Sequence, residues 1–280
     1  MQNGTRNYMV RATAHDGLVR AFAVDATNVV GELAARHRTE PAVSAALGRL
    51  STGALLFGAM LKDEDQLVTI RVQGDGPAGT LLASANGRGE VRGLVGTPRP
   101  YVEQVINGKL NVRGAVGTAG RITVTKDLGM RQPYSGTVQI VSGEIGEDLA
   151  HYLASSEQVP SAVGIGVFVQ PDESIEAAGG YIVQLMPGVS DAVVSGIESA
   201  VRELPHPTTM LRERETPEDM LSRIFGDGGF TVLDRVPVRF HCPCTKERAE
   251  RALLLLGAAQ IRELREDQGA ELKCEFCLEA

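Results

Sequence analysis

The four cysteines of this 280-residue chain are all near its C-terminal end. Cys242 and Cys244 are one residue apart, Cys274 and Cys277 are two apart, and 29 residues separate the two pairs. Two closely spaced pairs are typical of chelating turns, and four thiolates complete the tetrahedral shell of Zn²⁺ with no open position. The sequence therefore predicts one structural zinc ion per chain, bound by these four cysteines, with His241 beside the site and not in it.

The residues between the two pairs predict a small helical hairpin. Thr245 is placed to cap a helix through "KERAERALLLLG", and a second short helix follows through "AQIRELRED". A domain of residues 236–280 is near the size at which an apolar core alone is insufficient, so metal binding would supply folding free energy. Oxidants convert thiolates to disulfides, and each disulfide would withdraw two ligands from the metal. We therefore expect oxidation to act as an unfolding switch for this domain.

Residues 1–187 predict an α+β domain, with a mostly antiparallel sheet and packed helices. Two alternating segments flank Asp16-Gly17 and predict a hairpin, and short strands separated by glycine-rich turns recur between residues 66 and 140. Helices are predicted from "TNVVGELAARHR", from "PAVSAALGRLSTGALLFGAMLK" with Pro41 near its first turn, and from "GEDLAHYLASSE". The segments "GIGVFVQ" and "GGYIVQLM" predict two more strands. Sheet with a few helices, and no regular alternation of the two, is the α+β pattern.

Residues 188–235 have a different character and predict a helical linker. Ser190 begins a helix with one apolar stripe, and Thr216 and Asp219 form the capping box of a second helix, with Gly226 beyond its end. Both helices are short and charged, so each depends on docking its apolar stripe for stability. We expect this linker to be folded but metastable.

Net charge limits the classes of partner. The chain carries a net charge of −7 and a pI near 5.4, which gives no general attraction for nucleic acid or anionic lipid. The N-terminus lacks the pattern of a secretory signal, and no run of about 18 apolar residues is present. We expect a cytoplasmic protein without a nucleic-acid or membrane partner, where clustered cysteines more often bind metal or do redox chemistry.

No catalytic constellation is visible in residues 1–187, so we expect no enzyme. "GDGPAG" at Gly74 to Gly79 has the spelling of a dinucleotide loop, but a strand-like run follows it where the fingerprint needs a helix. "GTAG" at Gly117 to Gly120 lacks the lysine of a phosphate loop. The histidines at positions 15, 37, 151 and 206 show no spacing of a metal or nucleophile site.

The chain resembles the redox-regulated heat shock protein 33 chaperones, or HSLO-type chaperonins, over nearly its whole length. Five segments carry the resemblance: "SAALGR" at Ser44 to Arg49, "SSEQVPS" at Ser155 to Ser161, "GGYIVQLMPG" at Gly179 to Gly188, Cys242-Pro243-Cys244 with the following "KER", and Cys274-Glu275-Phe276-Cys277. The C-x-C pair ahead of a C-x-x-C pair at this spacing is the most specific of these features.

The resemblance implies an ATP-independent holdase that is inactive when reduced and zinc-bound. Oxidation would form the disulfides Cys242–Cys244 and Cys274–Cys277, release zinc and unfold the tail and then the linker. The exposed apolar surface would bind unfolding client proteins, and clients would later pass to ATP-dependent chaperones. The active form in the family is typically a homodimer. Family members commonly continue beyond the second pair, whereas three residues follow Cys277 here, so we expect a changed redox threshold and an unchanged ligand set.

Three alternatives stay open at this point. A zinc ribbon that binds nucleic acid is disfavoured, because residues 236–280 carry seven basic and eight acidic side chains and few aromatics. A thiol oxidoreductase would place its C-x-x-C at the start of a helix in a strand-helix-strand unit, whereas this pair closes the chain. A constitutive chaperone with a purely structural zinc differs from the switched holdase only in the stability of the zinc domain, which the sequence does not define.

Overall fold

The computed structural model describes residues 7–254 and 271–279 of the chain. The fold divides into two compact units, Met1–Phe240 and His241–Ala280. The boundaries of the helical linker at residues 188 and 235 fall inside the first unit and stay a prediction.

The first unit contains two main sheets, and the first of these is antiparallel throughout. Its five strands follow the order β10 (Ser161–Val169), β11 (Ile175–Leu185), β2 (Val19–Asp25), β1 (Tyr8–Ala14) and β12 (Phe230–Pro237). The predicted hairpin is confirmed as β1 and β2, joined by a short 3-10 turn, η1 (His15–Gly17). Asp16 adopts φ +54° in that turn, a conformation that aspartate tolerates better than most residues.

The second sheet has six strands and is antiparallel except at one edge. Its order is β13 (Arg239–Phe240), β5 (Glu90–Val95), β4 (Thr80–Asn86), β3 (Leu67–Gly74), β8 (Gly120–Asp127) and β9 (Tyr134–Gln139), and β13 runs parallel to β5. A separate hairpin is formed by β6 (Val105–Ile106) and β7 (Lys109–Leu110), and the short helix α3 (Val112–Val116) follows it.

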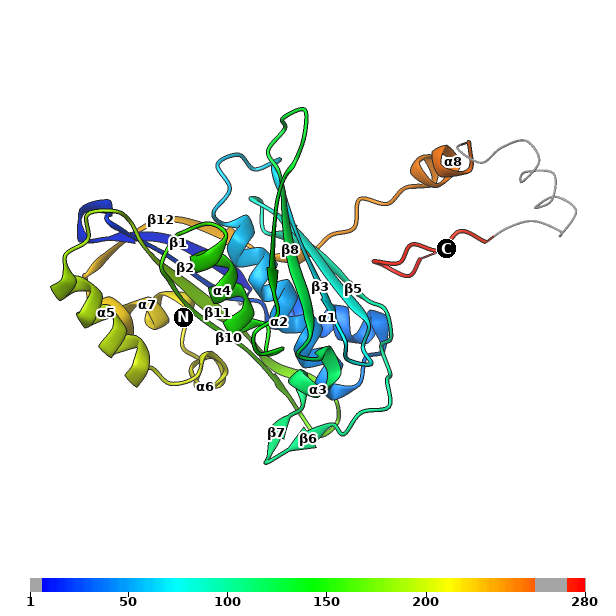
Figure 1. Cartoon of the computed structure of the whole chain (residues 1–280), viewed down its shortest axis with the longest axis horizontal. Helices are drawn as coiled ribbons and strands as arrows, with labels where there is room; N and C mark the ends of the chain where they lie inside the picture. Colours follow the sequence, from blue (N-terminus) through cyan, green and yellow to red (C-terminus); the bar gives the residue numbers. More distant parts are fainter. Residues whose placement is uncertain (1–6, 255–270, 280) are drawn as a thin grey trace, which may run out of the picture. The chain divides into compact units, whose positions relative to one another are not determined.

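The main core is between these two sheets and is centred on one helix. α2 (Pro41–Gly58) contacts β4 and β5 on one side and β10 and β11 on the other (Figure 1). α1 (Thr27–His37) and α4 (Gly146–Ser155) pack beside it. The helix can approach its neighbours closely because Gly48 has no side chain, and a Cβ there would be 2.5 Å from Val30 Cγ1 and 2.8 Å from Val167 Cγ2. The small residues of the predicted central helix therefore set the spacing of the core.

The opposite face of the five-stranded sheet is covered by the last three helices of the unit, α5 (Asp191–Glu203), α6 (Pro207–Arg212) and α7 (Pro217–Phe225). Ile197 of α5 and Leu221 and Ile224 of α7 share a buried cluster with β1, β2 and β11. α6 contributes to a smaller cluster with Met220. Because β2 is covered on both faces, its near-continuous apolar run is explained.

The α+β prediction is confirmed, and so are the helices at α1, α2, α4, α5 and α7. The predicted capping box of α7 is present, with Asp219 N–H donating to Thr216 Oγ1 at 3.2 Å. Ser190 occupies the N-cap of α5, but its side chain makes no capping hydrogen bond. Four features are not predicted by the sequence, namely α6, the strands β12 and β13, and the short elements between residues 105 and 116.

Candidate metal centre

The second unit places the two cysteine pairs on short, irregular segments. Cys242 and Cys244 are in an extended stretch that leads into α8 (Lys246–Leu254), and Arg248 N–H donates to Thr245 Oγ1 at 3.3 Å. The predicted cap by Thr245 is therefore confirmed. The predicted helix end at Gly257 and the second predicted helix through "AQIRELRED" fall outside the described residues. Cys274–Cys277 form a turn in which Leu278 N–H donates to Cys274 O at 2.8 Å.

The structure brings all four sulfur atoms together. The Sγ atoms of the four cysteines lie within 4.8 Å of one another, and all four cysteines are free of disulfides. The shortest separations join the two pairs: Cys242 Sγ to Cys274 Sγ is 3.6 Å, and Cys244 Sγ to Cys277 Sγ is 3.2 Å. A tetrahedron with metal–sulfur bonds of about 2.3 Å has edges of about 3.8 Å. The observed spacing fits that geometry, so the four cysteines could hold a metal ion.

Backbone donors make the four sulfurs unequal. Partial burial alone would raise the pKa of Cys274, but N–H groups of Cys277 and Phe276 donate to its sulfur and lower the pKa to about 7. The hydrogen bond to Cys277 raises the pKa of Cys244, and burial raises the pKa of Cys277. The lowered pKa favours the thiolate form of Cys274, which is the nucleophilic form of a cysteine side chain. The sequence does not predict these backbone donors, although two residues between cysteines are the length that such a turn needs.

His241 and the other histidines are not part of this group. Across residues 7–254 and 271–279, the four cysteines are the one set of three or more metal-binding side chains close enough to share an ion. His37 is buried with Nε2 3.0 Å from Gly93 O, and His206 caps α6 by accepting from Thr208 N–H. His151 contacts Ser155 on its own helix.

The glycine-rich motif at Gly74 to Gly79 forms a tight connection between β3 and β4. Asp75 Oδ1 accepts the N–H groups of Thr118 at 2.9 Å and Ala119 at 3.0 Å. A Cβ at Gly76 would be 2.4 Å from Ala115 O, so glycine permits the close approach of α3. The strand β4 follows where a dinucleotide loop requires a helix.

Comparisons with known proteins give the context of this cysteine group. The family described as "Hsp33 protein" matches residues 7–280. The 33 kDa chaperonin of Bacillus subtilis is 48% identical over 274 residues, which is 98% of this chain and 94% of that protein. The 33 kDa chaperonin of Enterococcus faecalis is 46% identical over 272 residues, covering 97% of this chain and 91% of the relative.

A solved structure is similar over the same length. The crystal structure of the 33 kDa chaperonin (heat shock protein 33 homolog) from Thermotoga maritima superposes with a TM-score of 0.91 at 33% identity, covering 98% of this chain and 93% of that chain. Within the described part of the chain, no helix has the length and apolar character needed to cross a bilayer. The family model matches nearly all residues, the relatives are almost half identical, and the fold is shared with a solved structure. These findings agree with the cysteine cluster. The chain therefore belongs to the Hsp33 family of chaperonins.

Proposed function

We propose that this chaperonin is an ATP-independent holdase controlled by the redox state of its four cysteines. The carrying observation is the group of four free thiols with sulfurs within 4.8 Å of one another. In the reduced state Cys242, Cys244, Cys274 and Cys277 bind one Zn²⁺, which has the affinity for thiolates and the four-coordinate geometry that this set offers. The zinc-bound state is the inactive one.

Oxidation removes the ligands in pairs. Two thiolates and one hypochlorous acid give one disulfide, one chloride and one hydroxide, so two equivalents of oxidant convert all four ligands and release the zinc. We propose the pairing that the family resemblance implies, Cys242–Cys244 and Cys274–Cys277, in which one or two residues separate the partners. Those pairs stay close even after the rest of the unit has unfolded, whereas the cross-pair contacts depend on the folded unit.

Loss of the metal removes the contribution of metal binding to the folding free energy of residues 236–280. We propose that the linker of residues 188–235 unfolds next. Residues 1–187 of the first unit would remain as the folded chaperone core. The helices of the linker cover an apolar face that includes Val10, Ala21, Tyr181 and Val183. An exposed face of that kind binds apolar segments of unfolding proteins. The active form would be a homodimer in the cytoplasm that later releases clients to ATP-dependent chaperones, as the family resemblance implies.

The first experiment measures light scattering from a thermally unfolding client protein. This chain is added either reduced and zinc-loaded or after treatment with hypochlorous acid. We expect suppression by the oxidised protein alone, reversed by reductant plus zinc. Equal suppression by both forms would contradict the switch and leave a constitutive chaperone with a structural zinc. Absence of suppression by either form would contradict holdase activity itself.

A second experiment tests the ligand set. Cys242→Ser replaces one thiolate by a hydroxyl and should reduce zinc occupancy and protease resistance of the tail under reducing conditions. His241→Ala is the matched control, because it alters the neighbouring residue, which is outside the sulfur group. Full zinc content and unchanged protease resistance in Cys242→Ser would contradict the four-cysteine assignment. Loss of zinc in His241→Ala would show that His241 also takes part in zinc binding.

A further inference from the structure

The chain passes from one sheet to the other immediately before the first cysteine pair. β12 ends at Pro237 on the edge of the five-stranded sheet, and β13 begins at Arg239 on the edge of the six-stranded sheet. Val238, between them, is buried and its N–H donates to Asn7 O at 3.0 Å. Cys242 is the second residue after Phe240. We call residues 238–240 the latch.

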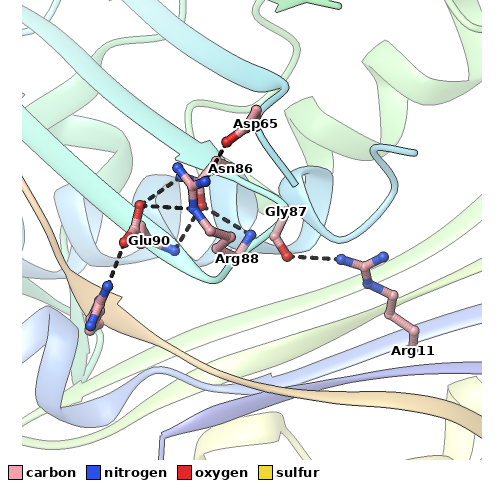
Figure 2. Close-up of polar contacts among 7 residues, drawn as sticks. Arg11, Asp65, Asn86, Gly87, Arg88 and Glu90 are labelled. Carbon is pink, nitrogen blue, oxygen red and sulfur yellow. Dashed lines mark hydrogen bonds and ion pairs between the residues drawn. The ribbon is translucent and has the colours of Figure 1, made fainter. Parts of the chain in front are cut away.

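Glu90 of β5 is the polar anchor of the latch. Its side chain is 9% exposed, and Oε1 accepts from Arg239 Nη2 at 2.6 Å. Oε2 accepts from Asn86 Nδ2 at 2.8 Å and is 3.6 Å from Arg88 Nε, an arrangement that Figure 2 shows around the labelled Glu90. A buried carboxylate is stable only when it is paired and hydrogen-bonded. Arg239, Arg88 and Asn86 therefore together satisfy the buried carboxylate of Glu90.

The turn between β4 and β5 provides the backbone half of the latch. Gly89 O accepts Arg239 N–H at 2.9 Å. Gly89 has φ +77°, and a Cβ at this position would be 2.3 Å from Pro237 O, so only glycine allows this approach. On its other side, the same turn reaches β1, because Gly87 O accepts from Arg11 Nη2 at 2.9 Å (Figure 2). One turn thus joins the N-terminal strand to the latch.

Phe240 adds an apolar contact. It is partly buried and packs against the main core, and the guanidinium carbon of Arg36 on α1 is 4.5 Å from its ring centroid. An arginine at this distance from an aromatic ring is attracted to its face. A backbone hydrogen bond, an ion pair and an aromatic contact therefore hold two consecutive residues, Arg239 and Phe240.

We propose that the latch stops unfolding of the cysteine unit from spreading into β12 and the linker helices, and that its strength sets how readily the chaperone is activated. The latch lies between Cys242 and β12 in the chain, so unfolding that spreads along the chain from Cys242 reaches β13 first and β12 next. β12 in turn supports α7, because Arg235 Nε donates to Glu218 Oε1 at 2.6 Å. The role in activation rests on the proposed function, whereas the role as a barrier to unfolding does not.

The test is hydrogen exchange of the full reduced chain, measured by mass spectrometry on peptides from β12 and α7, with and without a zinc chelator. Arg239→Ala removes the ion pair and leaves the backbone of β13 in place, and Arg239 is 70% exposed, so the variant should fold. We expect the exchange rate of β12 to rise about two- to tenfold, the size expected for losing one hydrogen bond from a largely exposed arginine. The rise should be larger with chelator than without it. Phe240→Ala should raise the exchange rate of β12 about tenfold or more relative to the wild type.

Arg121→Ala is the matched control, since Arg121 is an exposed arginine of β8 that donates to Gln73 Oε1 and is outside the latch. The proposal is overturned if both latch variants exchange within twofold of Arg121→Ala in both conditions. It is supported further if the latch variants suppress client aggregation at a lower dose of oxidant. Failure of the oxidised wild type to hold clients would refute the proposed function, and the exchange data would still decide the latch.

Discussion

Two helices of the first unit, α2 and α5, differ in how much of their surface is buried. Sixteen of the eighteen residues of α2 are buried, and the helix contacts both sheets. α5 has thirteen residues and buries only Ile197 fully. A helix buried all round leaves only by unfolding the unit, whereas a helix held by one stripe detaches at the cost of that stripe. The comparison distinguishes a core helix, buried on all sides, from a helix that is docked by one face.

The largest effect should come from α2. Phe57 is fully buried and its ring centroid is 6.0 Å from that of Tyr152. Phe57→Ala should lower the free energy of unfolding by about 3–5 kcal/mol, because it removes a large side chain and leaves a cavity. Denaturant unfolding of the reduced protein checks this. Tyr101→Ala, at a fully exposed aromatic, is the control, and equal losses in both variants would contradict the central role of α2.

A smaller and more local effect is expected on α5. Ile197→Ala should weaken docking by about 2 kcal/mol, at the low end for such a truncation, since the site is on the surface of the sheet and can relax. Hydrogen exchange should rise in α5 and α7 and stay unchanged in α2. Glu198→Ala changes the exposed neighbour and should alter neither. A rise in α2 exchange that equals the rise in α5 would show one cooperative unit and break the comparison.

The cap of α7 should contribute less. Thr216 Oγ1 accepts Asp219 N–H, and Asp219 Oδ2 accepts Thr216 N–H at 2.7 Å. Thr216→Ala should destabilise α7 by about 1 kcal/mol through loss of the side-chain half of this box. Local exchange of α7 measures it, with Thr209→Ala on the exposed side of α6 as the control. Equal exchange rates of α7 in the two variants would show that the capping box does not contribute to the stability of α7.

The smallest effect should be a pH dependence of the stability of α6. Burial lowers the pKa of His206, with smaller contributions from Arg49 and Lys109. The folded state therefore keeps the imidazole neutral, while the unfolded chain binds a proton below about pH 6.5. Stability should be complete above that pH and should fall as the pH drops toward the lowered pKa.

His206→Asn keeps a residue that caps helices well and removes the titration, so it should flatten the pH dependence of α6 exchange between about pH 5 and 7. His15→Asn, at an exposed histidine, is the control. An unchanged slope in His206→Asn would assign the pH dependence to another group.

Much of this organisation is readable in the sequence. The cysteine spacing predicts the sulfur cluster, and the small apolar residues of α2 predict a central helix. The lack of a catalytic constellation in residues 1–187 agrees with membership of a non-enzymatic chaperonin family. These features are local patterns, or depend on residue type alone, and need no knowledge of the fold.

The features that the sequence does not predict depend on distant partners. β12 is an edge strand that is mostly exposed, so its alternation is weak, and its pairing with β1 joins residues more than 200 positions apart. α6 begins with Pro207 at its first position, where proline after His206 reads equally well as a helix breaker. The strand of the latch, β13, has two residues and pairs in parallel with β5, and it is too short for any periodic signal.

The pairing of β1 with β12 has a consequence for protein synthesis. β1 is among the first segments to leave the ribosome, yet its outer edge stays open until β12 has been made, about fifty residues after β11. At bacterial elongation rates of 5–20 residues per second, this interval is roughly 3–10 s. An open strand edge invites pairing with other chains. A nascent chain arrested between β11 and β12 therefore presents its oldest strand as the exposed edge of a four-stranded sheet.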